Sequence, residues 1–342
     1  SQWIINAIHH KPLHGTPPVF SWAGSTRISM FKFAVATLGC KVNQCESAGI
    51  SETMTVGMRL VPFDEEADCY IVNTCTVTGR TDYQSRQLIR RAIRRNPTAV
   101  VLVTGCYAQR APEEIARIPG VRIVAGKAEK SNLSELIREL AEGKGPQVRV
   151  GDIRNEKRFI PLGAAAFPEH TRAFLKIQDG CNAVCSYCIV PQARGASRSL
   201  LPAEVEKGIA SLAREGYREV VLAGIHLGAY GRDLIPATDL TAMVRRIAET
   251  EPVERLRLSS IEPREVTDEL LSLIGSSGVV CRHLHIPLQS GDDGILNAMN
   301  RDYDAVFFRD LVQKVHDVSP DIAVGIDIIA GFPGETETAF TN

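Results

Sequence analysis

The sequence of 342 residues has no long apolar run and no marked excess of charge of either sign. No stretch approaches the roughly 18–20 apolar residues that cross a bilayer, so we expect no membrane partner. Its 39 basic and 40 acidic side chains give a net charge of −1. That balance argues against adhesion of the whole molecule to nucleic acid, DNA included, but it allows a local basic face.

The chain also lacks an initiator Met and a basic segment ahead of an apolar one, so no secretory signal is indicated. The first methionine is Met30, and we expect residues 1–29 to be a disordered leader or a translated upstream region. Nine cysteines without an export signal indicate metal binding or catalysis in a reducing compartment, which we expect to be the cytoplasm.

Residues 30–142 alternate short apolar runs with helical periods, which is typical of a parallel sheet covered on both faces. We expect strands at 31–38, 68–73, 99–104 and 121–124. We expect helices near 44–58, 82–95, 112–117 and 132–141. The prediction is a flavodoxin-like α/β domain, followed by a poorly periodic linker at 143–170.

A second alternating series fills residues 171–342. We expect strands at 172–177, 219–223, 255–259, 283–288 and 322–329, with amphipathic helices between them. Repeated β/α units of this length build an open α/β sheet or a barrel. Five units do not close an eight-unit barrel, so we expect an incomplete, TIM-like partial barrel.

Three cysteines follow the first strand of that series. Cys181, Cys185 and Cys188 stand at a C-x3-C-x2-C spacing. Three thiolates so close together can hold three corners of one iron–sulfur cluster, and no fourth cysteine follows nearby. An iron with an open coordination position would result, which a chemically active metal needs. The alternative is a zinc loop, but a structural zinc site normally has a fourth Cys or His ligand nearby.

Three further cysteines each stand just past an expected strand of the first domain: Cys40, Cys75 and Cys106. The carboxyl ends of parallel strands lie on one edge of a sheet, and ligands bind there. We therefore expect these thiols to meet and to hold a second cluster with an open iron. The alternative is that each is a small buried apolar side chain, as cysteine often is.

Several other residues have competing interpretations. We interpret Cys45, Cys69 and Cys281 as structural thiols. His226 is expected to be structural rather than an acid–base group, and Arg194 and Arg198 to be structural rather than SAM or substrate contacts. A dense basic helix is formed by Arg80, Arg86, Arg90, Arg91, Arg94 and Arg95. Its charge indicates either a solvated face or phosphate contacts, with equal weight.

The C-x3-C-x2-C loop, with Tyr187 before its last cysteine, resembles the radical S-adenosylmethionine (SAM) superfamily. That resemblance implies a [4Fe-4S] cluster on Cys181, Cys185 and Cys188 that cleaves SAM. The loops after the later strands would line the SAM site. We expect Tyr187, Gly224, Ser260, Glu262 and Gln289 to contact SAM, although the superfamily's Gly-Gly-Glu reads Ala-Gly-Ile-His at 223–226.

The motifs Gly-Cys-Lys-Val-Asn-Gln at 39–44, Asn-Thr-Cys at 73–75 and Gly-Cys-Tyr-Ala-Gln at 105–109 resemble the methylthiotransferase family. So do Ser-Ser-Ile-Glu-Pro at 259–263 and His-Ile-Pro-Leu-Gln-Ser-Gly at 285–291. Lys-Val-Asn-Gln is typical of the branch that acts on N6-threonylcarbamoyladenosine in tRNA.

The resemblance implies two [4Fe-4S] clusters and SAM as cofactors. The cluster on Cys40, Cys75 and Cys106 would carry the sulfur, and adenosine 37 in the tRNA anticodon loop would receive it. An electron donor such as a flavodoxin is implied as a partner. The family's sixth barrel strand and C-terminal TRAM domain are absent from these residues, so we expect weak tRNA binding and little turnover. Alternatives are another methylthiotransferase branch, acting on isopentenyladenosine or a ribosomal protein, a two-cluster electron-transfer protein, and a catalytically silent scaffold that binds tRNA or protein.

Overall fold

The computed structural model describes residues 31–55, 57–163 and 171–342. The expected leader at 1–29 lies outside these residues. The chain divides into two compact units. Unit 1 comprises the described residues up to Thr171 together with Gln192–Gly195, and unit 2 comprises Arg172–Pro191 and Ala196–Asn342.

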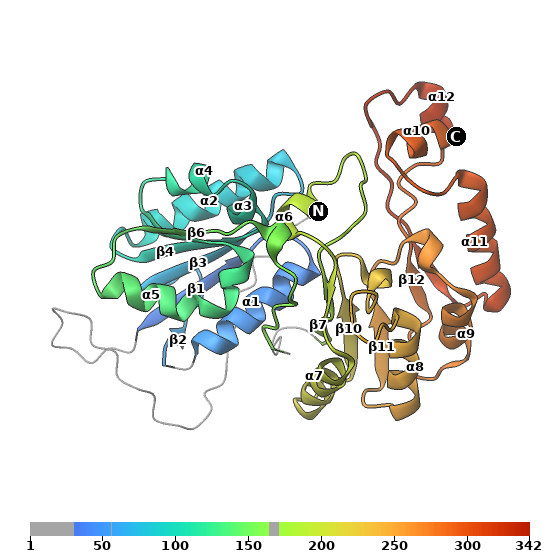
Figure 1. The fold of residues 1–342 in the computed structure, drawn as a ribbon, viewed down its shortest axis with the longest axis horizontal. Helices are drawn as coiled ribbons and strands as arrows, with labels where there is room; N and C mark the ends of the chain where they lie inside the picture. The colour runs from blue at the N-terminus through green and yellow to red at the C-terminus, as the bar shows by residue number, and fades with distance from the viewer. Residues whose placement is uncertain (1–30, 56, 164–170) are drawn as a thin grey trace. The chain divides into compact units, whose positions relative to one another are not determined.

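Unit 1 is built on a six-stranded parallel sheet of order β2-β1-β3-β4-β5-β6 (Figure 1). Its strands are β1 (Lys32–Thr37), β2 (Arg59–Leu60), β3 (Cys69–Thr74), β4 (Val100–Gly105), β5 (Val121–Ala125) and β6 (Gln147–Arg149). The order of the first five strands is that of flavodoxin-like folds. The predicted fold of this region is therefore confirmed.

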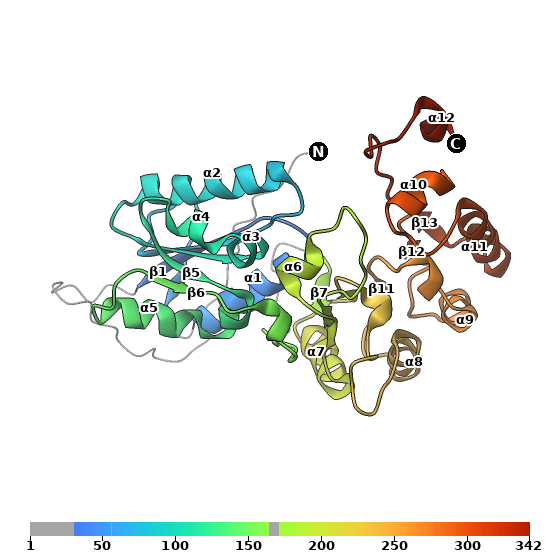
Figure 2. The same ribbon diagram turned by 45° about the horizontal axis from the view of Figure 1, so that its top comes forward.

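Helices cover both faces of this sheet because successive strand residues point to opposite sides. On one face, Ile71 and Leu102 pack against α1 (Lys41–Met54) and α5 (Leu133–Ala141). On the other face, Val72 and Val103 pack against α2 (Gly79–Arg95), α3 (Cys106–Arg110) and α4 (Pro112–Ala116). Figures 1 and 2 show these two layers of helices with the sheet between them. The 3₁₀ turn η1 (Lys127–Asn132) leads into α5.

The structure differs from the sequence-based expectation at several places in unit 1. The stretch expected to be a linker contributes β6, which pairs with β5 through Ile123 and Gln147. Its three residues are largely exposed and carry no apolar run, so no periodicity marks them. The strand β2 is shorter still, with two residues, and α1 begins three residues earlier than expected.

Unit 2 repeats the β/α alternation that the sequence predicts. Its five main strands are β7 (Ala173–Lys176), β10 (Glu219–Ala223), β11 (Arg255–Leu258), β12 (His283–His285) and β13 (Ala323–Gly325). Its longer helices are α7 (Pro202–Arg214), α8 (Leu240–Thr250), α9 (Asp268–Ser276) and α11 (Ala305–Val318). Parallel pairing joins β7, β10 and β11, and separately β12 and β13, with a bridge from Leu256 to Val280 linking the two groups. This arrangement is a partial barrel of the predicted class.

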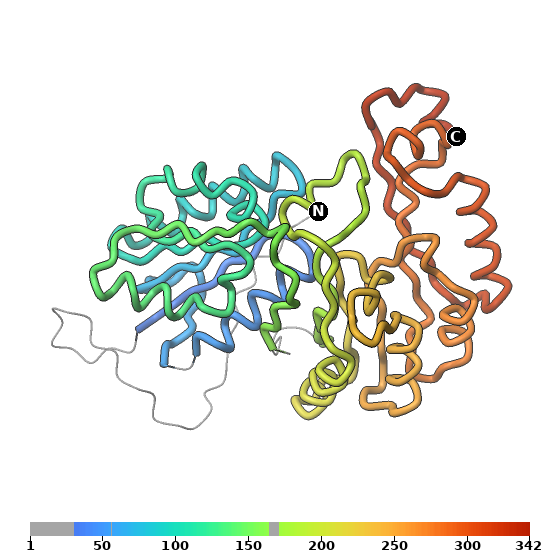
Figure 3. Tube along the Cα trace, viewed as in Figure 1, coloured from blue at the N-terminus to red at the C-terminus, as the bar shows by residue number. Residues whose placement is uncertain are grey.

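The cysteine-bearing loop of unit 2 has a closed base that the sequence does not reveal. After β7 the chain forms β8 (Gln178–Asp179), and after the loop it returns as β9 (Arg198–Ser199). These strands pair antiparallel, so they pinch the two ends of the loop together. Figure 3 traces this excursion between β7 and α7. The expected strands at 283–288 and 322–329 are only three residues long.

No helix among the described residues is long and apolar enough to cross a membrane.

Candidate active site

Three neighbouring parallel strands of unit 1 end in the cysteines that the sequence singles out. Cys40 caps α1 after β1, Cys75 follows β3 directly, and Cys106 is the first residue of α3 after β4. The strands are in register at these ends, with Thr37 opposite Asn73 and Thr74 opposite Gly105. The three thiol-bearing segments therefore share one edge of the sheet.

Close approach at this edge depends on Gly39, whose φ of +111° lies in the left-handed region. A Cβ at Gly39 would lie 3.0 Å from the Cβ and 3.1 Å from the Sγ of Cys75. The thiols also influence one another. Burial raises the pKa of Cys75, and the neighbouring Cys106 and Cys40 raise it further. Glycine thus lets the Cys40 loop lie directly against Cys75.

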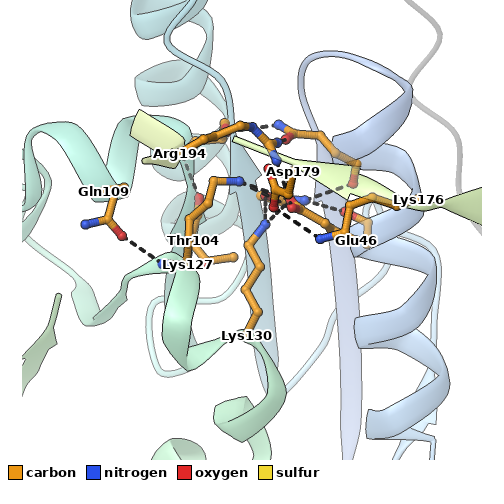
Figure 4. A network of polar contacts seen from close by, with 12 residues as sticks. Glu46, Thr104, Gln109, Lys127, Lys130, Lys176, Asp179 and Arg194 are labelled. Carbon is orange, nitrogen blue, oxygen red and sulfur yellow. Dashed lines mark hydrogen bonds and ion pairs between the residues drawn. The ribbon is translucent and has the colours of Figure 1, made fainter. Parts of the chain in front are cut away.

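A buried polar network in unit 1 surrounds the carboxylate of Glu46 (Figure 4). Lys127 Nζ lies 3.3 Å from both Glu46 oxygens, and Lys130 Nζ contacts the same carboxylate. Arg194 Nη1 donates to it at 3.1 Å. All four side chains are at most 3% exposed. The Arg194 guanidinium is therefore bound to Glu46 inside this network.

These cations act on the nearest cysteine. Burial raises the pKa of Cys106, but Arg194, Lys127 and Lys130 outweigh this effect and bring the pKa below its usual value. Burial also lowers the pKa of Lys130 itself, to about 7, although Glu46 opposes that shift. The network therefore supplies positive charge beside Cys106, which favours a thiolate.

Two buried asparagines join this network to the cysteine-bearing segments. Asn43 Nδ2 donates to the carbonyls of Leu38 and Thr74, at 2.6 and 3.1 Å. Asn73 Nδ2 donates to the Asn43 carbonyl at 3.0 Å, and its Oδ1 accepts from Lys130 Nζ at 3.0 Å. The ends of β1 and β3 are thereby fixed to the start of α1. No sequence motif indicates Glu46, Lys127 or Lys130, because the carboxylate lies more than 80 residues from the two lysines.

In unit 2, Cys181, Cys185 and Cys188 lie in the loop closed by β8 and β9, and all three are partly exposed. Gln178 holds the base of this loop: its Nε2 donates to the Gly180 carbonyl at 2.7 Å. Burial raises the pKa of Cys188, with smaller contributions from Cys185 and Cys181. The three thiols are thus close enough to interact electrostatically.

Two of these thiols have a basic side chain beside the sulfur. His226 Nδ1 lies 3.3 Å from Cys181 Sγ, and His226 Nε2 lies 3.0 Å from a carboxylate oxygen of Glu265. Burial lowers the pKa of His226, but Cys181 and Glu265 together raise it to about 10. Arg301 Nη1 donates to Cys185 Sγ at 3.2 Å, and its other nitrogen contacts Glu262.

No sequence motif indicates Arg301, which lies 116 residues from Cys185. The sequence favours a structural role for His226 over acid–base chemistry. The structure places it against a cysteine of the loop. Its backbone N–H also donates to Gln178 Oε1 at 2.7 Å, which fixes the loop after β10 to the base of the cysteine loop.

The expected SAM contacts lie in the loops after successive strands of unit 2. The Tyr187 ring lies 6.5 Å from that of Phe332, and the pKa of Tyr187, raised mainly by burial, also responds to Arg301 and Glu262. Ser260 Oγ is 2.8 Å from His285 Nδ1.

The backbone constrains two of these residues, Gly224 and Gln289. A Cβ on Gly224 would come within 3.1 Å of the Gln178 side chain, and Gln289 adopts a left-handed φ of +69°. Tyr187 and Glu262 therefore lie near Cys185. Gly224 lies near Cys181 because it packs against Gln178, which accepts a hydrogen bond from the backbone of His226. Ser260 is held by His285 and Gln289 by the backbone of Asp327, so a shared role in SAM binding stays a prediction.

Across the described ranges, no three His, Cys, Asp or Glu side chains already have the arrangement of a metal site. The chemistry of both cysteine sets nevertheless suits an iron–sulfur cluster. Each set offers three thiols, which is one fewer than full ligation of a cubane requires. Each also has cationic neighbours that offset thiolate charge, namely Lys127, Lys130 and Arg194 for one and His226 and Arg301 for the other.

Comparison with known families assigns a class to each region. Residues 32–126 match "Uncharacterized protein family UPF0004", and residues 175–342 match "Radical SAM superfamily". A solved radical SAM methyltransferase, TsrM from Kitasatospora setae, superposes with a TM-score of 0.65 at 16% identity. That superposition covers 91% of this chain and 69% of the other. At this identity it shows a similar fold and nothing further. The fold and the cysteine loop thus define a radical SAM enzyme.

Curated relatives narrow this class. "Threonylcarbamoyladenosine tRNA methylthiotransferase MtaB" of Bacillus subtilis is 44% identical over 91% of this chain and 69% of its own length. "tRNA-2-methylthio-N(6)-dimethylallyladenosine synthase" of Clostridium tetani is 34% identical over 90% of this chain and 69% of its own length. The chain belongs to the radical SAM methylthiotransferase family and is of the MtaB type. The family inferred from the motifs is confirmed.

Proposed function

We propose that the protein converts N6-threonylcarbamoyladenosine at position 37 of tRNA to its 2-methylthio derivative. The observation that carries this proposal is the pair of cysteine triads, one on a sheet edge and one in a loop, in a chain of the MtaB type. Such a substrate would place the reaction in the cytoplasm. It also requires an electron donor, for which a flavodoxin has the right chemistry.

In this proposal Cys181, Cys185 and Cys188 hold one [4Fe-4S] cluster, and Cys40, Cys75 and Cys106 hold a second. When bound, these clusters and SAM supply the electron, the sulfur and the methyl group, none of which acid–base side chains can provide. The protein's own contribution is to leave one iron of each cluster without a cysteine. It also places hydrogen-bond donors beside the sulfurs, which orient the ligands.

The SAM contacts in this proposal are Tyr187, Gly224, Ser260, Glu262 and Gln289. Gly224 suits a close approach because it carries no side chain, and a Cβ there would crowd Gln178. Glu262 keeps its carboxylate about one-third exposed while it pairs with Arg301, so it can accept a further bond from an amino group. Arg301 thereby links a SAM contact to a ligand of the cluster.

The test is anaerobic reconstitution with iron and sulfide, followed by reaction with tRNA from a strain that lacks the modification. Wild-type protein should bind about eight iron atoms per chain, and Cys181→Ala and Cys40→Ala variants should each bind about four. Cys69→Ala, which alters a buried thiol in β3, is the matched control and should retain the full complement. Digested tRNA analysed by mass spectrometry should contain the 2-methylthio derivative of threonylcarbamoyladenosine, in low yield because the expected turnover is small.

Other outcomes would contradict the proposal. Product formed only on isopentenyladenosine, or on a ribosomal protein, would assign the chain to another branch. Two clusters without SAM binding would indicate electron transfer. Zinc alone, or a single cluster, would contradict the two-cluster assignment.

A further inference from the structure

The exposed face of α2 carries positive charge without counter-charge. Along this face lie Arg80, Tyr83, Gln87, Arg91 and Arg94, at helical spacing, with Arg90 beside them. The helix has no lysine and one acid, Asp82, whose carboxylate is taken by Arg110 at 2.7 Å. Since the whole chain has a net charge of −1, this is a local concentration rather than a general property.

Four of these arginines are available to a partner. No carboxylate of the described residues lies within ion-pair distance of Arg80, Arg90, Arg91 or Arg94. Arg86 differs, because it is paired with Glu114 at 3.1 Å and donates to the Tyr107 hydroxyl at 2.7 Å. Arg80, Arg90 and Arg94 are exposed to solvent. Arg91 is partly buried, as the paired Arg86 is.

Neighbouring parts of unit 1 extend this surface. A Cβ at Gly120 would lie 2.8 Å from Ile93, so the turn after α4 lies against the C-terminal half of α2. That turn carries exposed Arg117, which also lacks an ion pair within the described chain. The aromatic ring of Tyr83 is 55% exposed among the arginines, as suits stacking on a base.

The arginine surface of α2 runs from the cysteine-bearing edge of the sheet toward the far end of the helix. α2 begins four residues after Cys75, at the sheet edge that carries the cysteines, and runs 17 residues away from it. Arg86, Arg90 and Arg94 follow one another at intervals of four residues, roughly 5–6 Å apart. Arg80 lies at the end of α2 nearest the sheet edge. A polyanion lying along α2 would therefore lead to the edge where Cys40, Cys75 and Cys106 stand.

We propose that the α2 arginine face, defined as Arg80, Arg90, Arg91 and Arg94, binds the phosphate backbone of the substrate tRNA. The planar guanidinium fork matches phosphate geometry and can bind a phosphate through two parallel hydrogen bonds. This inference rests on the proposed tRNA substrate and adds the surface that holds it. Because the contacts are to phosphates, they set affinity and position but not base sequence.

The test compares tRNA binding by two triple variants across a series of salt concentrations. In the first, Arg90, Arg91 and Arg94 are changed to Gln, whose helix propensity is similar. In the control, Arg138, Arg149 and Arg154 are changed to Gln; all three are exposed in unit 1 and ion-paired. Both variants lose three positive charges, so net charge is matched.

The α2 variant should bind unmodified tRNA roughly 100-fold more weakly at about 0.1 M salt, with the slope of log K against log salt reduced by about 2–3. The control should change the slope by less than about 1. Equal effects of the two variants, or binding by the α2 variant like that of wild type with an unchanged melting temperature, would overturn the inference. Failure of wild-type protein to bind tRNA would instead contradict the proposed function, and this inference with it.

Discussion

The cysteines of the two sets are brought together in opposite ways. Cys40, Cys75 and Cys106 are up to 66 residues apart and meet only because three parallel strands end together. Cys181, Cys185 and Cys188 lie within eight residues, on one loop pinched by β8 and β9. The first set therefore depends on the whole fold of unit 1, and the second depends mainly on its own loop.

The charged groups beside the two cysteine sets also differ. Beside Cys106 the positive charge is buried and shared through one carboxylate, Glu46. Around the loop, single donors contact single sulfurs, His226 at Cys181 and Arg301 at Cys185. A defect in the buried network should thus spread to the whole unit, whereas a defect at the loop should alter one ligand.

The largest expected effect comes from Glu46→Gln. This change leaves Lys127, Lys130 and Arg194 buried around a neutral amide, and loss of one partner of a buried ion pair costs about 3–5 kcal/mol. Urea unfolding should show that loss, and iron should be lost from the Cys40 set alone. The control Glu135→Gln removes an exposed pair with Arg138 and should cost less than about 1 kcal/mol. Equal losses would mean that the buried network is not what stabilises unit 1.

A smaller effect is expected for Gly39→Ala. The new Cβ would meet Cys75 at 3.0 Å in a left-handed backbone, which should destabilise unit 1 by about 1–3 kcal/mol and reduce iron bound by that set. Gly143→Ala is the matched control, because Gly143 also has positive φ but has open space around it. Retention of all iron by Gly39→Ala would show that close approach to Cys75 is not required.

At the loop, Arg301→Met should change a redox property of the cluster held there. Removing a charged donor from Cys185 Sγ should lower the reduction potential of the cluster there by about 50–100 mV. Electron paramagnetic resonance during a redox titration measures this shift. Arg264→Met, whose guanidinium lies over Phe307 rather than at a sulfur, should leave the potential unchanged. A shift of equal size in both variants would assign it to lost charge alone.

The smallest expected effect concerns pH. The pKa of Lys130 is near 7 when folded and 10.5 ordinarily, so between these values the unfolded state binds more protons. Stability should therefore rise with pH through this window, by less than about 1.4 kcal/mol per unit from this group. Lys130→Met should flatten the rise in unfolding measurements, and Lys144→Met, at an exposed position, should not. An unchanged slope in Lys130→Met would mean that Lys130 stays charged.

The sequence allowed most of the fold to be predicted because its signals are local. Apolar runs such as 99–104 and helical periods such as 82–95 depend only on neighbouring residues. The missed strand β6 has three largely exposed residues, so its place is decided by pairing with β5. The strands β8 and β9 are two residues each and exist through their mutual pairing.

By itself, the sequence determined the spacing of Cys181, Cys185 and Cys188 and the strand-end positions of Cys40, Cys75 and Cys106, since both patterns follow from adjacent residues. Only the tertiary structure decided which charges stand beside them. Glu46 meets Lys127 and Lys130 across 81 and 84 residues, and Arg301 meets Cys185 across 116. Hydrogen bonds and ion pairs act over a few ångströms in space, so no local pattern of residues encodes such partners.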